Sequence, residues 1–336
     1  MICYHKTMTT LPTTTSPVYD IAIIGGGING AAIARDAALR GLSVYLCEQD
    51  DLASATSCAS SKIIHGGLRY LESYQFSMVR KSLKEREVLL GIAPHVVTPL
   101  KFILPYSKAH GQLLRPRWLI RLGLFVYDHL YASKRLGKTR GLDFEKVSAS
   151  RPLQDIYKKG FLYCDGWADD ARLVVLTAAD AAEHGATIAP RTKCENLTRD
   201  GSVWQLTVQT QGGSCQIQAR TVVNATGPWA EKFLKNTDYA QQSQPLTLVK
   251  GSHIVVPKLF DHKNAYTLQV ADGRVVFVFP YEKQFTLIGT TDTPFDGDPA
   301  EAASDDDEIQ YLCDVVNGYF KKQITPAEVV WTYSGV

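Results

Sequence analysis

The sequence predicts an α/β protein with a Rossmann-type nucleotide-binding domain and a second domain built on an antiparallel sheet. Three observations carry this prediction. Residues 19–48 read as a strand, a glycine-rich turn, a helix, a second strand and an acid. From Pro245 onward, the pattern changes to longer strands of the antiparallel type. The length of 336 residues suits two domains of ordinary size.

The glycine-rich turn follows the apolar residues 21–24. It contains Gly25, Gly27 and Gly30 in the spacing G-x-G-x-x-G, with Gly26 between the first two. The first glycine permits a sharp turn, the second lets the backbone approach a pyrophosphate, and the third lets a helix pack closely on the strand. An isolated motif of this kind is weak evidence. Here the strand, turn and helix occur in the required order, which predicts a dinucleotide site.

An acid completes this pattern. Residues 31–39 are rich in helix formers, Gly41 ends that helix, and residues 42–47 read as a strand that leads to Glu48. A carboxylate here accepts hydrogen bonds from a ribose with a free 2′-OH and repels a 2′-phosphate. The pattern therefore disfavours NADP, and by itself it leaves the choice between NAD and FAD open.

Residues 53–71 combine small polar residues and glycines with an apolar stretch that holds His65, Arg69 and Tyr70. Small side chains let a backbone lie against a flat ligand and donate hydrogen bonds to it. A flexible surface loop is the alternative interpretation. The apolar neighbours of the three functional side chains favour the wall of a ligand site.

The remaining elements are expected from periodicity and from capping residues. They are a helix over 77–92, strands over 96–105 and 160–167, a helix over 171–184, short strands over 186–188, 204–209, 215–219 and 221–223, strands over 246–256, 274–280 and 285–290, a helix capped by Ser304 and Asp305 that runs to residue 320, and a last strand over 329–336. The strand over 221–223 runs into Ala225, Thr226 and Gly227. Open α/β sheets bind ligands at such strand ends, so these residues are expected at the nucleotide site.

Residues 115–136 are basic and aromatic. Arginines and lysines flank Trp118, Phe125, Tyr127 and Tyr131. One interpretation is a helix packed inside its own domain, and the other is a surface helix that docks on anionic lipid. The sequence leaves both open.

Charge and composition exclude other classes. The chain has 36 basic and 34 acidic residues, and this balance gives no electrostatic footprint for nucleic acid. The 7 cysteines are scattered, as expected for reduced thiols in a cytoplasmic protein. The 8 histidines lack metal-ligand spacing, so no metal site is expected. No apolar run reaches the roughly 18 residues that a membrane span needs.

Both ends of the chain carry expectations of their own. The Thr-rich residues 1–17 are expected to be a disordered tail rather than a secretory signal, and Met8 is an alternative start. The last predicted strand stops in mid-pattern without a polar tail. We therefore expect a fragment of a longer protein.

Several segments together resemble the FAD-dependent, respiratory glycerol-3-phosphate dehydrogenase family. The resemblance covers residues 19–336 almost continuously, and its most specific part is the loop over residues 56–70. The segments that carry it are GGGINGAAIARDAALRGLSV, TSCASSKIIHGGLRYLE, VNATGPW, KGSHIVVP, FTLIGTTD and VVWTYSGV.

The resemblance implies a fold. A glutathione-reductase-like FAD-binding domain would comprise residues 18–92 and 169–235. An antiparallel-sheet substrate domain, interleaved with it, would comprise residues 93–168 and 240–336. The family continues past this point with an arginine, a glycine-rich segment that closes the FAD site, and a helical C-terminal domain.

The resemblance also implies a reaction and its partners. The family oxidises sn-glycerol 3-phosphate to dihydroxyacetone phosphate with FAD, and the electrons pass to quinone, or to oxygen in oxidase relatives. Its members are peripheral on the cytoplasmic face of the cytoplasmic membrane, which makes residues 115–136 a candidate lipid contact. A homodimer is a compatible assembly.

Matching positions imply roles for particular residues. Those that would hold FAD are Gly25, Gly26, Gly27, Gly30 and Glu48 at the ADP half, Thr56, Ser57, Ser61 and Lys62 along the flavin and pyrophosphate, and Ala225, Thr226 and Gly227 beneath the cofactor. His65 would act on the substrate hydroxyl, since the pKa of histidine lies near working pH. Its alternative role is a hydrogen bond that only shapes the loop.

Four residues are implied as substrate contacts. Arg69 and Tyr70 would hold the substrate, because a guanidinium can bind a phosphate through two hydrogen bonds. An intradomain ion pair and a core tyrosine are their alternatives. Lys250 and His253, in the KGSH segment, are further candidates on the substrate sheet.

Two other functions stay open. A related amine- or amino-acid-oxidising flavoenzyme would share the fold, and turnover with amino acids would indicate it. A nucleotide-binding module without turnover would suit a chain that ends before part of the active site. Nucleotide binding without substrate-driven flavin reduction would indicate that module.

Overall fold

The computed structural model describes residues 17–107, 116–270 and 272–336. The described chain divides into two compact units, which are treated separately below. The first unit runs to Ser54 and includes Val174–Pro245, and the second unit comprises Ala55–Leu173 and Leu246–Val336. Residues 55–92, assigned to the nucleotide-binding domain by resemblance, group with the second unit. The expected N-terminal tail and Arg115 lie outside the described residues, apart from residue 17.

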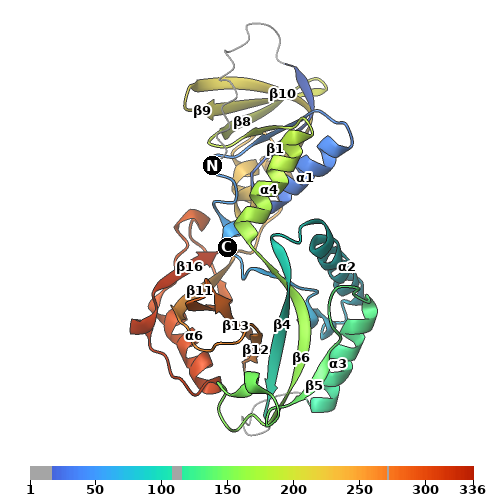
Figure 1. Ribbon diagram of the computed structural model, residues 1–336. Helices are drawn as coiled ribbons and strands as arrows, with labels where there is room; N and C mark the ends of the chain where they lie inside the picture. Colours follow the sequence, from blue (N-terminus) through green and yellow to red (C-terminus); the bar gives the residue numbers. More distant parts are fainter. Residues whose placement is uncertain (1–16, 108–115, 271) are drawn as a thin grey trace. The chain divides into compact units, whose positions relative to one another are not determined.

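A six-stranded mixed sheet forms the first unit (Figure 1). Its strands, in spatial order, are β7 (Thr187–Ala189), β2 (Val44–Cys47), β1 (Val18–Ile24), β10 (Gly213–Asn224), β9 (Val203–Thr210) and β8 (Lys193–Asp200). The first four are parallel, and β8, β9 and β10 form an antiparallel meander. This is the sheet that the nucleotide-binding pattern predicts.

Two strands of this sheet differ from expectation. β10 is one strand of 12 residues rather than two short ones, because its first half pairs with β9 and its second half with β1. β8 was not predicted. Its sequence, KCENLTRD, is mostly polar, and a register shift between Cys194 and Asn196 interrupts its alternation.

Three helices complete this part of the chain: α1 (Ile28–Leu39), α4 (Asp170–Glu183), which begins in the second unit, and α5 (Ala230–Lys235). α1 packs on the sheet through Ala34, Ala37 and Ala38. These small side chains bring the helix axis close to the strands. The beginning of α1 is therefore held near the carboxyl end of β1.

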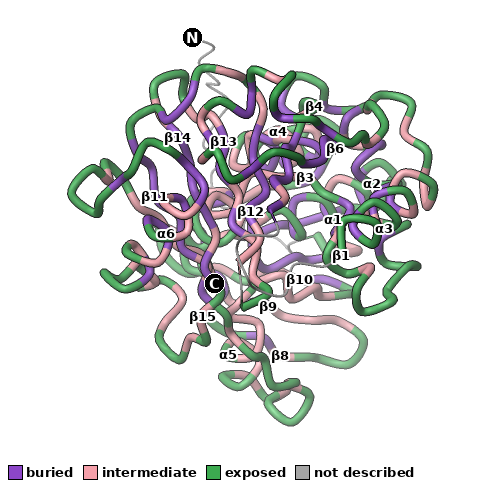
Figure 2. The backbone as a smooth tube through the Cα atoms, turned by 90° about the horizontal axis from the view of Figure 1, so that it is seen from below, coloured by how far each residue is buried: buried purple, intermediate pink, exposed green. Residues whose placement is uncertain are grey.

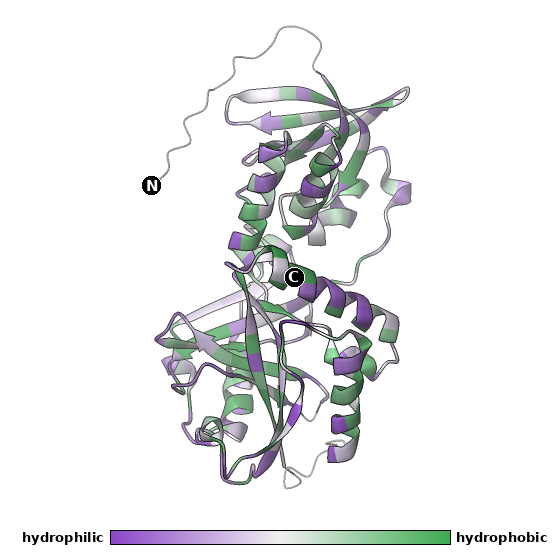
Figure 3. Cartoon of the chain, turned by 45° about the vertical axis from the view of Figure 1, so that its right-hand side comes forward, coloured by the Kyte–Doolittle hydropathy of each residue, from purple (hydrophilic) through white to green (hydrophobic). Residues whose placement is uncertain are grey.

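A ten-stranded, mostly antiparallel sheet forms the second unit. The path runs through β15 (Thr293–Pro294), β11 (Val249–Pro257), β14 (Phe285–Gly289), β13 (Val275–Tyr281), β12 (Ala265–Gln269), β4 (Val97–Tyr106), β6 (Lys159–Ala168) and β3 (Ile63–Ile64), with β16 (Trp331–Gly335) on β11 and β5 (Arg140–Asp143) on β6. Within the described chain, β12 and β4 are the one parallel pair of this sheet. Buried residues follow these strands (Figure 2), as do the apolar residues (Figure 3).

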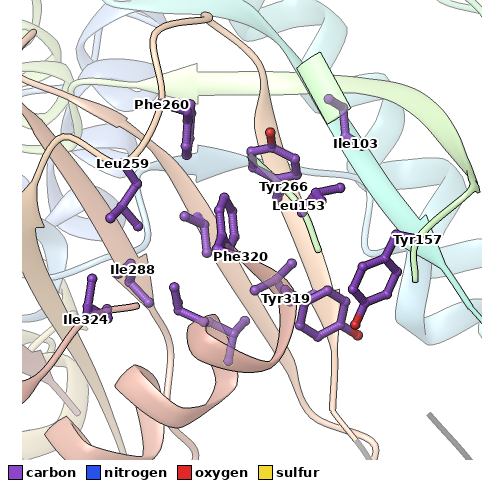
Figure 4. Close-up of a cluster of buried hydrophobic side chains, with 14 of the residues drawn as sticks. Ile103, Leu153, Tyr157, Leu259, Phe260, Tyr266, Ile288, Tyr319, Phe320 and Ile324 are labelled. Atoms are coloured by element: carbon purple, nitrogen blue, oxygen red, sulfur yellow. The ribbon is translucent and has the colours of Figure 1, made fainter. Parts of the chain in front are cut away.

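Helices cover this sheet on two sides (Figure 1). α6 (Asp306–Tyr319) packs over a core that includes Tyr266, Ile288 and Phe320 (Figure 4). α2 (Phe76–Ile92) and α3 (Arg117–Leu130) lie beside β4 and β6. Asp305 is the N-cap residue of α6 and forms a capping box with Glu308, so the predicted cap is correct at Asp305 and not at Ser304.

Candidate active site

The carboxyl ends of three parallel strands meet at one edge of the first sheet. The last residues of β1, β2 and β10 are paired across neighbouring strands. The residues that follow, Gly25, Glu48 and Ala225, therefore lie side by side. Ala225 donates its N–H to the Ile24 carbonyl at 2.8 Å. Open α/β sheets bind their ligands at such an edge.

Two glycines of the fingerprint occupy positions where a side chain would not fit. Gly25 has a φ of +113°, and a Cβ there would lie 2.4 Å from the Ala225 carbonyl oxygen. A Cβ on Gly30 would lie 1.9 Å from the Gly25 carbonyl oxygen. Only glycine therefore allows this turn and this close packing of α1 against it.

The N-terminus of α1 has features that favour an anion. Gly27 is the N-cap residue, no side chain caps the helix, and no acid lies in the first turn. Backbone N–H groups and the helix dipole both favour a negative charge at this position. These features suit a pyrophosphate at the turn.

Glu48 is tied to the glycine turn. Its Oε2 accepts the N–H of Gly26 at 2.6 Å, and its Oε1 accepts the N–H of Asp50 at 2.9 Å. An ionised carboxylate has about four lone-pair positions. Glu48 therefore keeps acceptor capacity for ribose hydroxyls while it holds the turn.

The loop after β10 is held by a residue that the sequence analysis did not single out. The Asn224 side-chain oxygen accepts the Thr226 hydroxyl at 2.6 Å and the Thr226 N–H at 3.2 Å. Gly227 follows with a φ of +58°. The structure thus brings Ala225, Thr226 and Gly227 to the same sheet edge as the glycine turn.

In the second unit, His65, Gly66 and Gly67 form a turn between β3 and the 3₁₀ helix η2 (Leu68–Leu71). We call these three residues the HGG turn. Gly67 has a φ of +73° and donates its N–H to Nδ1 of His65 at 2.9 Å. A Cβ on Gly67 would lie 2.4 Å from the ring of Tyr70. The glycine therefore permits both the left-handed turn and the packing of that ring.

The HGG turn forms part of the wall of a cavity of about 920 Å³. His65, Arg69 and Tyr70 all line this cavity, and all three are exposed. The structure thus brings together the three residues that the sequence singled out in the loop. The volume lies in the range of small-molecule sites.

The cavity contains one cation without a fixed partner among the described residues. Arg274 is paired with Asp272 at 2.6 Å, whereas Arg69 makes no ion pair within the described chain. Burial opposes ionisation of Asp272, but the hydrogen bonds from Arg274 and the nearby charge of Arg69 lower the pKa of the Asp272 carboxyl. Arg69 is accordingly available for an anionic ligand.

Residues of the predicted flavin loop already have protein partners, including Thr56, whose hydroxyl donates to the Val336 carbonyl at 2.7 Å. Lys62 forms an ion pair with Asp170 at 2.7 Å, with both side chains largely buried. Ser61 hydrogen-bonds Nε2 of His253 at 2.8 Å. Thr56 and Ser57 lie in the 3₁₀ turn η1 (Thr56–Cys58). These contacts fix the path of the loop, and direct contact with a cofactor stays a prediction.

Lys250 and His253 lie inside the second unit and not on the wall of the cavity. Lys250 pairs with Glu308 at 2.8 Å and Asp305 at 3.1 Å. His253 is 2% exposed and stacks on Tyr333 at 4.7 Å. The structure does not bring these two residues to the other substrate candidates.

Three buried residues behind the HGG turn were not found from the sequence. Arg86, Tyr127 and Asp165 come from α2, α3 and β6, far apart in the chain. Their local patterns read as a solvated helix face, an aromatic helix and a buried strand. Only the tertiary fold brings them together.

The first unit has the sheet, the glycine turn and the acid of a dinucleotide-binding α/β protein, and the second has a ligand cavity on an antiparallel sheet. The chain belongs to the FAD-dependent oxidoreductase family, whose model matches residues 20–336. The predicted fold class and the predicted cofactor, FAD, are thereby confirmed.

Known proteins agree with this assignment. A glycerol-3-phosphate dehydrogenase of Pseudomonas aeruginosa is 51% identical over 95% of this chain and 61% of its own length. A D-erythritol 1-phosphate dehydrogenase of Brucella abortus is 49% identical over 94% of this chain and 62% of its own. The structure of a Bacillus halodurans glycerol-3-phosphate dehydrogenase complexed with FAD has a TM-score of 0.75 at 29% identity, over 95% of this chain and 56% of that one.

The residues present fit FAD. The uncapped start of α1, with no acid in its first turn, suits a pyrophosphate, and Glu48 suits a ribose. The chain spans about 61% of the length of the first curated relatives.

The first prediction concerns the close packing at Gly30. Replacing Gly30 by alanine places a methyl group 1.9 Å from the Gly25 carbonyl, and real Cβ contacts are longer than 3.0 Å. The start of α1 must then move by about 1 Å. We expect the dissociation constant for FAD to rise at least about tenfold, the equivalent of 1.4 kcal/mol. Titration of the apo-protein with FAD, followed by flavin fluorescence, measures it.

Gly123→Ala is the matched control, because among the described residues no atom outside the local helix backbone lies within 4 Å of a Cβ at that position. It should leave FAD binding unchanged. Unaltered FAD affinity in Gly30→Ala would contradict the role given to this glycine.

The second prediction concerns His253. Burial first, and the charge of Lys62 second, lower the pKa of His253 from 6.5 to about 3. The unfolded chain therefore binds a proton that the folded chain does not, and stability that is complete above about pH 7 is lost as the pH falls below 6.5. Between pH 7 and pH 5 this contribution should fall by about 2 kcal/mol.

Denaturant unfolding of the wild type and His253→Gln at both pH values measures that contribution. The difference between their free energies of unfolding should shrink by this amount at pH 5. Parallel pH dependences in the two proteins would show that His253 titrates normally.

Proposed function

We propose that the protein oxidises sn-glycerol 3-phosphate to dihydroxyacetone phosphate and passes the electrons to a quinone. The observation that carries the proposal is the 51% identity to a glycerol-3-phosphate dehydrogenase over 95% of this chain. The cavity adds physical support, because a cation, Arg69, and a histidine, His65, are both among the residues that line it. Bound FAD would supply the two-electron acceptor for the hydride that leaves C2 of the substrate.

Arg69 is the candidate for the substrate phosphate. Its guanidinium lines the cavity and has no ion-pair partner within the described chain. A planar guanidinium can donate two parallel hydrogen bonds to phosphate oxygens. Tyr70, on the same 3₁₀ turn, adds a hydroxyl to this wall.

His65 is the candidate for the proton of the substrate hydroxyl. Its Nδ1 accepts the Gly67 N–H, so the neutral ring carries its proton on Nε2. Proton acceptance at Nε2 needs the other tautomer and gives up this hydrogen bond, which costs about 1 kcal/mol. That is a factor of about five in rate, small beside the roughly 10²- to 10⁴-fold gain from general base catalysis.

A second candidate substrate is D-erythritol 1-phosphate. A dehydrogenase named for it is 49% identical over 94% of this chain, almost the same similarity. Both substrates carry a phosphate and a secondary hydroxyl, so Arg69 and His65 would serve either one. The cavity of about 920 Å³ also suits the longer polyol.

The third prediction is the direct test of this function. Anaerobic addition of glycerol 3-phosphate to the purified holoprotein should bleach the flavin spectrum, and erythritol 1-phosphate should be compared at equal concentration. His65→Gln should bind the substrate with similar affinity but reduce the flavin at least about 100-fold more slowly, since an amide cannot accept the proton.

Other results of the flavin-reduction test would change the proposed function. Faster reduction by erythritol 1-phosphate than by glycerol 3-phosphate would make erythritol 1-phosphate the preferred substrate. Reduction by glycine or another amino acid alone would replace the proposal by amino-acid oxidation. A bound flavin that no substrate reduces would indicate a binding module. Reduction by His65→Gln within tenfold of wild type would reject the histidine as the base.

We further propose that α3 contacts anionic lipid. One face of the helix is buried through Ile120, Leu124 and Tyr127, which satisfies the intradomain interpretation. The other face exposes Trp118, at 68%, and Phe125, at 56%. Within the described residues, no helix has the length and apolar character to cross a bilayer.

Charge complements this apolar face. Arg117 and Arg121 lie on the same helix. Neither makes an ion pair with another described residue, and the Arg117 guanidinium lies over the Phe161 ring, 5.7 Å from its centroid. An amphipathic helix with exposed aromatic and basic residues binds the headgroup region of anionic membranes. The quinone would be met at the same membrane.

The fourth prediction tests the lipid contact. The double variant Arg117→Glu with Arg121→Glu should bind phosphatidylglycerol-containing vesicles at least about tenfold more weakly, because each basic residue near the surface contributes about 1 kcal/mol. Vesicle co-sedimentation measures the binding. Lys263→Glu with Lys283→Glu makes the same charge change elsewhere and should bind as wild type. Equal binding by both double variants would remove α3 from the contact.

A further inference from the structure

Three charged or polar side chains are buried together behind the HGG turn. Arg86 of α2 is 4% exposed, Tyr127 of α3 is 2% exposed, and Asp165 of β6 is 3% exposed. Arg86 Nη1 hydrogen-bonds Asp165 Oδ1, and the Tyr127 hydroxyl lies 2.8 Å from the same oxygen. We call these three residues the buried triad.

The buried triad contacts the backbone of the HGG turn through one atom. The Gly66 N–H donates to the Tyr127 hydroxyl oxygen at 2.7 Å. A Cβ on Gly66 would lie only 2.7 Å from that hydroxyl. The glycine therefore allows the tyrosine to reach the backbone directly.

The direction of each hydrogen bond is determined by chemistry. Burial raises the pKa of Tyr127 well above its usual value, so the hydroxyl keeps its proton. Burial also raises the pKa of the Asp165 carboxyl, and the charge of Arg86 opposes this shift. Paired with Arg86, Asp165 accepts a hydrogen bond from that hydroxyl. The lone pair of the tyrosine oxygen then faces Gly66 and accepts its N–H. Arg86 thus orients Asp165, Asp165 orients Tyr127, and Tyr127 holds the turn.

A contribution to stability alone does not explain why these three side chains are buried together. Replacing a buried ion pair by apolar residues is often neutral or stabilising. The group here also leaves Arg86 Nε without a hydrogen-bond partner within the described chain. Asp165 moreover lines the same cavity as His65.

We propose that Arg86, Tyr127 and Asp165 are positioning residues that hold the HGG turn in place for His65. The inference rests on the proposed function for its kinetic consequence. When His65 exchanges tautomers, the Gly67 N–H loses its acceptor, and the Gly66 hydrogen bond to Tyr127 still holds the turn from the interior. The buried triad touches neither reacting atom and acts through the backbone.

The fifth prediction uses the holoprotein with Tyr127→Phe, which removes one oxygen atom and keeps the ring. Amide hydrogen exchange at Gly66 and Gly67 should become at least about tenfold faster, because the Gly66 N–H loses its acceptor. Flavin reduction at saturating glycerol 3-phosphate should slow at least about tenfold, since small misplacements of a reacting group have effects of this size or larger. The substrate dissociation constant should change less than the rate, because Arg69 lies on η2, which has its own hydrogen bonds.

Tyr266→Phe is the matched control. Tyr266 is also fully buried, and its hydroxyl donates to the Ala149 carbonyl at 2.6 Å, away from the turn. It should change neither exchange at the HGG turn nor the reduction rate. Should Tyr127→Phe fail to fold, Asp165→Asn replaces it, because the amide keeps the shape while Arg86 loses its charged partner.

The outcomes separate this inference from the proposed function. Unchanged exchange at Gly66 and Gly67 in Tyr127→Phe overturns the positioning role whatever the substrate is. Faster exchange with an unchanged reduction rate also overturns it, because the turn would then be held without effect on the chemistry. Failure of the wild type to be reduced by either polyol phosphate rejects the proposed function, and the exchange measurement still decides whether Tyr127 holds the turn.

Discussion

The close approach of helix α1 to strand β1 is the constraint on which the nucleotide site depends. The Gly25 carbonyl oxygen occupies the space that a side chain at Gly30 would need, and the Ala225 carbonyl oxygen does the same at Gly25. The small alanines on α1 extend this close packing along the helix. Because α1 begins so near the strand ends, its N-terminus lies at the same sheet edge as Glu48. The close packing of α1 on β1 thus determines the shape of the glycine turn, the position of the N-terminus of α1 and its nearness to Glu48.

In the second unit, too, glycines allow a turn and close packing at the candidate site. Its candidate site also depends on a glycine turn, and here the backbone is held by side chains from behind. Tyr127 reaches Gly66, while His65 and Arg69 face the cavity. α3 contributes that tyrosine from its buried face and exposes aromatic residues on the other. A single amphipathic helix therefore serves both the interior of the unit and its surface.

The features that could be predicted from the sequence are those whose residues lie close together in the chain. The glycine spacing, the strand before it and Glu48 lie within about thirty residues of each other, so their geometry is readable from the chain. The loop with His65, Arg69 and Tyr70 was found for the same reason. Lys62 and His253 were harder, because their partners, Asp170 and Ser61, are 108 and 192 residues away. The buried triad was missed entirely, since each member alone has an ordinary role, and strand β8 was missed because its partner strand overrides a polar sequence.

The most direct measurement of this account is the stoichiometry of FAD on the apo-protein. The close packing at Gly25 and Gly30, the open start of α1 and Glu48 together predict one FAD per chain, with the ADP half contributing most of the affinity. Calorimetric titration of the apo-protein with FAD and with ADP tests both points in one experiment. Binding of one FAD per chain, with competition by ADP, is the predicted result. Absence of FAD binding, or FAD binding that ADP does not compete with, would contradict the site described here.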